Sequence, residues 1–212
     1  MTAQKRRQLS LPVPDSALLK KILAITSNAP STVYAPSDDS FLMIDAIARL
    51  KVTGRRVLDM GTGSGILGLY CAMCGAEVTA SDIDEVAVQE VTRTAEALGM
   101  QMKTCVSDLF SNICDRFDLI LFNPPYVPSA RVEDRSIDGG SGGIVITNRF
   151  LERLPSHLNR RAEALLLLSS MNDSSSIQLR HSNLEFSTVA RKSLFFEELE
   201  VLRVRLRDDF TI

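Results

Sequence analysis

The chain has 212 residues, of which 24 are Lys or Arg and 26 are Asp or Glu, so its formal net charge at pH 7 is −2. This balance excludes the overall positive charge on which non-specific nucleic-acid binding depends, although it leaves room for a local basic patch. Hydrophobic residues make up 45% and charged residues 24%, as in an average globular protein, which excludes disorder for most of the chain. No apolar run approaches the roughly 18 residues of a membrane span, and no signal peptide is recognisable, so we expect a cytoplasmic protein.

Strands and helices are predicted to alternate along most of the sequence. We expect residues 1–30 to form a loose arm and a short helix, and residues 31–212 to form a single domain. Ser37 is a candidate N-cap for an amphipathic helix at the start of this domain. Strands are then predicted at 56–60, 77–81, 103–106, 117–122 and 162–168, with helices at 66–73, 84–98 and around 151. This alternation predicts an α/β sandwich around a mostly parallel sheet.

The segment 201–207 has a different pattern from the strands before it. Leu202, Val204 and Leu206 alternate strictly with three arginines. Such alternation is typical of a strand with one face in solvent, and therefore of an antiparallel strand near a sheet edge. We expect this strand to close the sheet.

A glycine-rich turn joins the predicted strand 56–60 to the predicted helix 66–73. It contains Gly61, Gly63 and Gly65, whose missing Cβ atoms allow the backbone to turn sharply and to contact a ligand. In an open α/β sheet, ligands bind where a strand passes into a helix in this way. The simpler alternative is a turn that merely connects the two elements. We favour it less, because the glycines lie between a strand and a helix.

The same turn also permits a dinucleotide-binding interpretation. Residues 63–68 match G-x-G-x-x-G, and Asp82 follows Gly63 by 82 − 63 = 19 residues. Asp59 lies just before the glycines, where its carboxylate can accept hydrogen bonds from a cationic amino group but repels a pyrophosphate. We therefore favour an adenosine that carries an amino-acid tail, and NAD remains an alternative.

Two further carboxylates follow the ends of successive strands. Asp82 can accept hydrogen bonds from both hydroxyls of a ribose. Asp108 can accept one from the exocyclic amine of an adenine, and the backbone N–H of Leu109 can donate to a ring nitrogen. Exposed acids at helix starts are the alternative explanation, but their positions at strand ends favour ligand contact.

The tetrapeptide Asn123-Pro124-Pro125-Tyr126 follows the predicted strand 117–122. Its prolines fix the backbone and remove two N–H donors, which leaves carbonyl groups free to accept. The Asn123 side chain and the Pro124 carbonyl together suit the two N–H groups of a planar NH2, with the Tyr126 ring stacked over its plane. Such positioning can orient a nitrogen lone pair toward an electrophile without a covalent intermediate. Taken alone, the tetrapeptide could also have a purely structural role, because proline pairs commonly end strands.

The glycine turn and the tetrapeptide together resemble those of S-adenosylmethionine (SAM)-dependent methyltransferases that act on planar nitrogens. More narrowly, the chain resembles the HemK/PrmC-like protein glutamine methyltransferases, because residues 33–40 are similar to the VYxPxxD[ST] segment of their small archaeal and eukaryotic branch. The similarity covers about residues 33–207. It implies a Rossmann-like, seven-stranded class I methyltransferase fold with an antiparallel C-terminal strand.

The resemblance also implies an activity, a cofactor and partners. Members of this family methylate the glutamine of the Gly-Gly-Gln motif in class I translation release factors, and the small members work with a zinc-ribbon activator subunit. By resemblance, Asn123 and Pro124, with Pro125 and Tyr126 beside them, bind the substrate, and Asn123, Pro124 and Tyr126 are catalytic. The implied SAM-binding residues are Ser40, Asp59, Gly61, Gly63, Gly65, Asp82, Asp108, Leu109 and Asn123.

Other interpretations remain open beside this one. The same chemistry could act on the exocyclic amines of adenine or guanine in DNA or RNA, which enzymes reach by base flipping. A cofactor-binding module without activity is a third possibility. Residues 129–143 are glycine-rich and polar, as in a loop that contacts substrate.

The cysteines and histidines do not indicate a metal site. Cys71 and Cys74 have C-x-x-C spacing, but the other two cysteines are poorly spaced to complete a zinc site, so we expect core packing and no metal. We expect His157 and His181 to lie at the surface.

Overall fold

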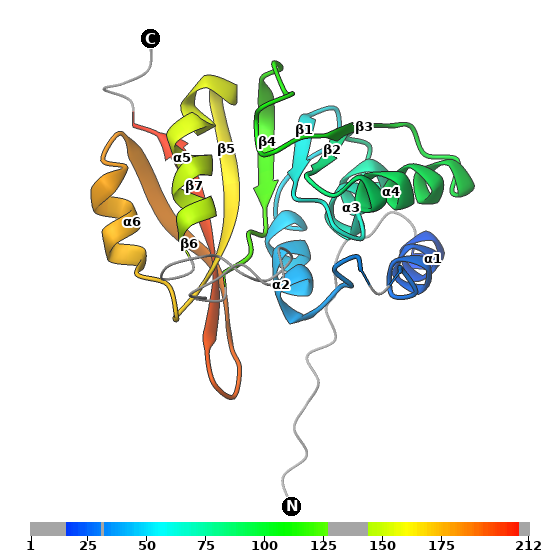
Figure 1. The fold of residues 1–212 in the computed structure, drawn as a ribbon, viewed down its shortest axis with the longest axis horizontal. Helices are drawn as coiled ribbons and strands as arrows, with labels where there is room; N and C mark the ends of the chain where they lie inside the picture. Colours follow the sequence, from blue (N-terminus) through cyan, green and yellow to red (C-terminus); the bar gives the residue numbers. More distant parts are fainter. Residues whose placement is uncertain (1–15, 31, 127–143, 208–212) are drawn as a thin grey trace, which may run out of the picture.

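The computed structural model describes residues 16–30, 32–126 and 144–207, and Figure 1 shows a central sheet with helices on both faces. The helices are α1 (Ser16–Thr26), α2 (Asp38–Ile47), α3 (Ile66–Met73), α4 (Glu85–Ala97), α5 (Val145–His157) and α6 (Ser174–Arg180). The strands are β1 (Arg56–Met60), β2 (Glu77–Asp82), β3 (Met102–Val106), β4 (Phe117–Phe122), β5 (Leu158–Ser169), β6 (Leu184–Ser193) and β7 (Glu198–Leu206). The segment 129–143, expected to contact substrate, lies outside the described residues.

The seven strands form one sheet in the order β3-β2-β1-β4-β5-β7-β6. Strands β1 to β5 run parallel to one another, whereas β7 is antiparallel to both β5 and β6. The predicted α/β fold, with a mostly parallel sheet and an antiparallel C-terminal strand, is therefore confirmed. The carboxyl ends of β1, β2, β3 and β4 all reach the same edge of the sheet, where the predicted site residues follow them.

Alternation along the strands divides the apolar side chains into two cores. In β4, Leu119 and Leu121 pack with α1, α2 and α3, whereas Ile120 and Phe122 pack with α5 and α6 on the other face. This division follows from the pleat, which points successive side chains to opposite faces. Both faces of the central strands are covered, as in parallel sheets generally.

The helix starts show how local sequence sets these elements. Ser37 is the N-cap of α2, as predicted, and its backbone N–H donates to the hydroxyl of Ser40 at 3.4 Å. Helix α1 continues to Thr26, and its Ile22 is fully buried in the core beside α2 and α3. No helix among the described residues is long and apolar enough to cross a membrane.

The sequence did not predict α6 or β6. Strand β6 lies at the edge of the sheet, has β7 as its one partner strand within the described part of the chain, and has a register shift between Thr188 and Ala190. Its side chains are mostly exposed or partly buried, so its sequence lacks the clear alternation of apolar and polar residues that marks a half-buried strand.

Candidate functional site

A cavity of about 750 Å³ lies at the carboxyl ends of the parallel strands. Its walls come from residues 32–40, from the turns after β1, β2 and β3, from the segment after β4 and from the start of α5. The predicted site residues that line it are Ser40, Gly61, Gly63, Asp82, Asp108, Leu109, Asn123, Pro124, Pro125 and Tyr126. Asp59 and Gly65 are not among its lining residues. The fold thus brings together most of the site residues predicted from the sequence.

The glycine turn needs glycine at each of its three positions. Gly61, Gly63 and Gly65 have φ values of +62°, +50° and +81°, a region that other residues rarely adopt. Gly61 and Gly63 line the cavity, whereas a Cβ on Gly65 would lie 2.6 Å from a methyl group of Val91 in α4. Gly65 therefore allows close packing of the helices, and the other two glycines shape the cavity wall.

Asp59 supports this turn from the inside of the molecule. Its side chain is almost fully buried, at 1% exposure, and its Oδ2 accepts hydrogen bonds from the Thr62 hydroxyl at 2.6 Å and the Gly68 N–H at 2.9 Å. Burial raises the pKa of Asp59 to about 7, although these two hydrogen bonds oppose the shift. The sequence-based role of this carboxylate, contact with a ligand amino group, stays a prediction.

Asp82 links the glycine turn to the end of β2. Its Oδ2 accepts a hydrogen bond from the Gly63 N–H at 2.9 Å, and its Oδ1 accepts one from the Asp84 N–H at 3.0 Å. Burial raises its pKa, and the backbone hydrogen bonds oppose that shift. Each carboxylate oxygen has a second lone pair, so Asp82 can still accept from a ligand in the cavity that it lines.

The turn after β3 contributes a strained backbone and an ion pair. Leu109 has a φ of +49°, a conformation that costs about 1–3 kcal/mol in a residue other than glycine, and its carbonyl accepts from the Ser107 hydroxyl at 2.7 Å. Arg149 of α5 binds the Asp108 carboxylate at 2.8 Å, and both side chains line the cavity. Local sequence signals do not indicate Arg149 as a site residue, because its partner lies 41 residues away in the sequence.

The tetrapeptide after β4 presents an unpaired acceptor. Asn123 Oδ1 is buried and has no hydrogen-bond partner among the described residues, although Asn123 lines the cavity. At the other end of the segment, the Tyr126 carbonyl accepts a hydrogen bond from the Asn172 side chain at 2.8 Å. An unpaired buried acceptor costs about 1–3 kcal/mol, which binding of a donor in the cavity recovers.

Asp39 is a site residue that the sequence analysis missed. It is 1% exposed, and its Oδ2 accepts hydrogen bonds from the hydroxyl groups of Tyr34 at 2.6 Å and Tyr126 at 3.5 Å. Burial and then the Asp39 charge raise the pKa of both tyrosines well above the ordinary value, so both stay protonated. The backbone N–H and the hydroxyl of Ser40 donate to its Oδ1. Asp39 thus connects α2 with both sides of the cavity.

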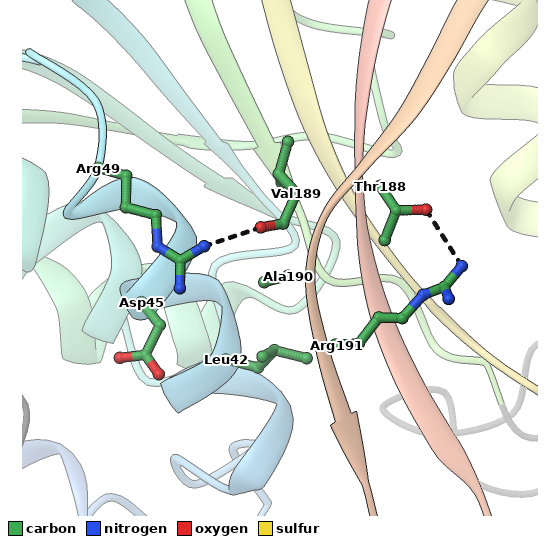
Figure 2. Close-up of a pocket in the computed structure, with 7 residues that line it drawn as sticks. All are labelled: Leu42, Asp45, Arg49, Thr188, Val189, Ala190 and Arg191. Carbon is green, nitrogen blue, oxygen red and sulfur yellow. Dashed lines mark hydrogen bonds between the residues drawn. The ribbon is translucent and has the colours of Figure 1, made fainter. Parts of the chain in front are cut away.

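A second, shallower hollow lies between α2 and β6 (Figure 2). Arg49 donates to the carbonyl of Val189 there at 3.0 Å, and Arg191 pairs with Glu200 at 3.4 Å. It contains none of the residues that the sequence nominated. We therefore place the candidate site in the cavity at the strand ends.

The comparisons with known proteins identify a family and its fold. Residues 38–195 match the family described as methyltransferase small domain. The chain is 32% identical over 179 residues to a protein of Methanocaldococcus jannaschii named "Putative protein N5-glutamine methyltransferase", covering 80% of this chain and 90% of that one.

Solved structures show the same fold. The E. cuniculi Mtq2–Trm112 complex, described as responsible for methylation of the eRF1 termination factor, has a TM-score of 0.69 and 21% identity, covering 83% of this chain and 99% of that one. The T. thermophilus 16S rRNA N2 G1207 methyltransferase RsmC, solved with AdoMet and guanosine, has a TM-score of 0.62 and 23% identity, covering 81% of this chain and 44% of that one.

Proposed function

We propose, from the premise that this chain belongs to the methyltransferase small domain family, that it methylates the side-chain amide nitrogen of a protein glutamine. The methyl donor in this proposal is SAM, and the substrate is the Gly-Gly-Gln glutamine of a class I release factor. The name of the M. jannaschii relative supports the chemistry, and the description of the E. cuniculi complex supports the substrate. The structural observation that carries the proposal is the buried, unpaired Oδ1 of Asn123 in the cavity.

A glutamine amide fits the acceptors of the tetrapeptide. Its planar NH2 group has two N–H bonds, which can go to Asn123 Oδ1 and to the carbonyl of Pro124. Two acceptors fix the plane of the amide and direct its nitrogen lone pair at the methyl group. An amide nitrogen is barely basic, so this positioning is the main source of the rate.

The residues that line the cavity fit SAM. The sulfonium of SAM supplies an electrophilic methyl group when the cofactor is bound. Asp82 suits the ribose hydroxyls, Asp108 and the backbone of Leu109 suit the adenine, and the glycine turn leaves room for backbone contact at Gly61 and Gly63. Ser40 and Asn123 border the same space. Asp59 and Gly65 act on this site from behind the turn, where they hold its conformation.

Tyr126 contributes its ring and its position to this reaction. Because burial and the Asp39 charge raise its pKa, its hydroxyl keeps its proton near neutral pH and does not act as a base. The glutamine nitrogen, once it has accepted the methyl group, releases its proton to water. No protein base is needed in this scheme.

Methylation of exocyclic amines in nucleic-acid bases is the second candidate function. It is favoured by the fold shared with RsmC, which was solved with guanosine. A base amine offers the same planar NH2 to Asn123 and Pro124. The net charge of −2 opposes it, because phosphate binding relies on Lys and Arg.

We also propose that a small zinc-ribbon activator subunit assists the enzyme. The E. cuniculi protein was solved in a complex with Trm112. In this chain β3 is an edge strand, and Val86 of α4 and Val106 at the end of β3 are exposed apolar residues. The outer side of an edge strand is a template for pairing with another chain, which supports a partner at this edge.

The proposal is tested by mass spectrometry of a class I release factor incubated with this protein and SAM. We expect one added methyl group, on the glutamine of Gly-Gly-Gln, in the presence of the activator subunit. No methylation with the activator present, combined with methylation of RNA, would replace the glutamine proposal with the nucleic-acid one.

A further inference from the structure

Two phenylalanines at the tip of the β6–β7 hairpin stand out on the surface. Phe195 and Phe196 are each 92% exposed, and their rings meet edge to face with centroids 4.6 Å apart. The turn that carries them is closed by a hydrogen bond from the Leu194 N–H to the Glu197 carbonyl at 2.7 Å. Turn geometry does not require aromatic residues at these positions, and large apolar side chains this exposed are typical of binding sites.

The topology places this hairpin at the same sheet edge as the cavity. Strand β6 is antiparallel to β7, and β7 is antiparallel to β5, so β6 runs in the direction of the parallel strands. The carboxyl end of β6 therefore points to the edge at which β1, β2, β3 and β4 end. Figure 1 shows the hairpin projecting beyond the rest of the sheet at this edge.

The hairpin is connected to the tetrapeptide by a series of hydrogen bonds. The Ser169 hydroxyl binds the Glu197 carboxylate, and the Ser169 N–H donates to Asn172 Oδ1 at 3.0 Å. The Asn172 amide in turn donates to the Tyr126 carbonyl at 2.8 Å. The phenylalanines thus have a defined position relative to Asn123-Pro-Pro-Tyr126.

A second connection joins the hairpin to the other wall of the cavity. Lys192, near the end of β6, forms an ion pair with Asp38 at 2.9 Å. Asp38 precedes Asp39, the residue that binds both Tyr34 and Tyr126. The hairpin is therefore anchored on both sides of the site.

We infer that Phe195 and Phe196 form the docking surface for the protein substrate, which binds them through an apolar patch beside its glutamine-bearing loop. This inference rests on the proposed function. A glutamine side chain is short, so the backbone that carries it must reach the mouth of the cavity. The remainder of the substrate then covers the surrounding sheet edge, where these two rings are exposed.

The surroundings of the rings favour a protein substrate over a nucleic acid or a second copy of this chain. Glu197 and Glu198 follow the pair directly and balance Arg191 and Lys192 before it, so the hairpin offers no net positive charge to a phosphate backbone. Two aromatic side chains bury about 150–250 Å² each, which is well below the area of a stable dimer interface. That area suits the central contact of a transient complex, in which a few aromatic residues dominate the binding energy.

The test compares Phe195→Ser/Phe196→Ser with Leu179→Ser in the full chain with its activator. Leu179 of α6 is 83% exposed and is a matched apolar residue elsewhere on the surface. Two substrates are used, an intact class I release factor and a short peptide that carries only its Gly-Gly-Gln loop. We expect the double variant to raise KM for the intact factor at least roughly tenfold, with kcat and the KM of the peptide unchanged. Leu179→Ser should change none of these values.

Binding of the release factor to the S-adenosylhomocysteine complex, measured by calorimetry, separates the two proposals. Weaker binding by the double variant supports the docking surface even if no methyl transfer is detected, in which case only the proposed function fails. Methylation with an unchanged KM, or no binding by the wild type, overturns the docking surface. The docking surface is also overturned if the double variant raises KM equally for the peptide and the intact factor. It is overturned as well if the wild type forms a dimer that the double variant does not form, or if the wild type binds RNA and the double variant does not.

Discussion

The two segments that border the cavity differ in how their polar groups are satisfied. In the glycine turn, the Asp59 carboxylate binds Thr62 and Gly68, and the Asp82 carboxylate binds Gly63. In the tetrapeptide, by contrast, Asn123 Oδ1 is buried without a partner among the described residues. The polar groups of the turn are therefore paired within the protein, whereas the tetrapeptide keeps an acceptor for the reacting group. This contrast predicts that changes in the turn mainly affect stability and that changes in the tetrapeptide mainly affect turnover.

The largest expected effect is on turnover and comes from Asn123→Ala. Loss of the unpaired acceptor should lower the single-turnover rate of methyl transfer roughly 100-fold or more, because it acts on the reacting amide. The affinity for S-adenosylhomocysteine, measured by calorimetry, should change far less. Transfer by the variant at the native rate would sink the proposed mechanism.

A large effect on stability is expected from Gly65→Ala in the turn. The new Cβ would lie 2.6 Å and 3.1 Å from the two methyl groups of Val91, at a φ of +81°, which should cost about 3 kcal/mol in urea denaturation. The matched control is Gly54→Ala, with a φ of +73° and open space around the new atom, which should cost about 1 kcal/mol. Equal losses of unfolding free energy in the two variants would mean that the close contact between Gly65 and α4 does not limit stability.

Asp59→Asn should change how stability depends on pH. The pKa of Asp59 is raised to about 7 in the folded protein and is about 3.9 in an unfolded chain, so the folded state binds its proton more tightly. This carboxyl therefore contributes stability at low pH that is lost as the pH rises from about 4 to about 7. The free energy of unfolding of the wild type relative to the variant should fall by roughly 2 kcal/mol between pH 5 and 7. Parallel curves for the two proteins would contradict the raised pKa.

The smallest expected effects come from the two tyrosines that share Asp39. Tyr34→Phe removes a hydrogen bond of 2.6 Å and should cost about 1 kcal/mol of stability, whereas Tyr126→Phe removes one of 3.5 Å and should cost less than about 0.5 kcal/mol. Both are measured by chemical denaturation. A reversed order would show that Asp39 is held mainly from the tetrapeptide side.

Local sequence signals predicted the elements that position the site. Strands β1 and β4 and helix α3 have the predicted bounds, because each is a short apolar run next to a glycine or proline segment. The sheet edge at which the site residues gather also followed from strand–helix alternation. The contacts of Asp39 could not be predicted in the same way, since its partner Tyr126 is 87 residues away.

The histidines show the same limit. Both were expected at the surface, and this prediction was wrong, because His157 and His181 are only 6% and 5% exposed. His157 stacks on Phe110 at 4.2 Å, and His181 forms a hydrogen bond with Asn148 Oδ1 at 2.9 Å. Polar neighbours in the sequence indicated exposure, but partners brought together by the fold decide it. Cys71, by contrast, is fully buried in the core, as predicted from its helix position.

The position of β7 between β5 and β6 has a consequence for synthesis of the chain. Strand β7 is made after the six other strands, yet it supplies the hydrogen bonds that join β6 to the sheet. Until residues 198–206 leave the ribosome, β6 has no partner strand and the outer edge of β5 is open. Unpaired strand edges attract other chains, so a ribosome that pauses before residue 198 exposes a nascent protein prone to aggregation. Rapid translation of residues 198–206, or a chaperone bound near β5, would shorten that interval.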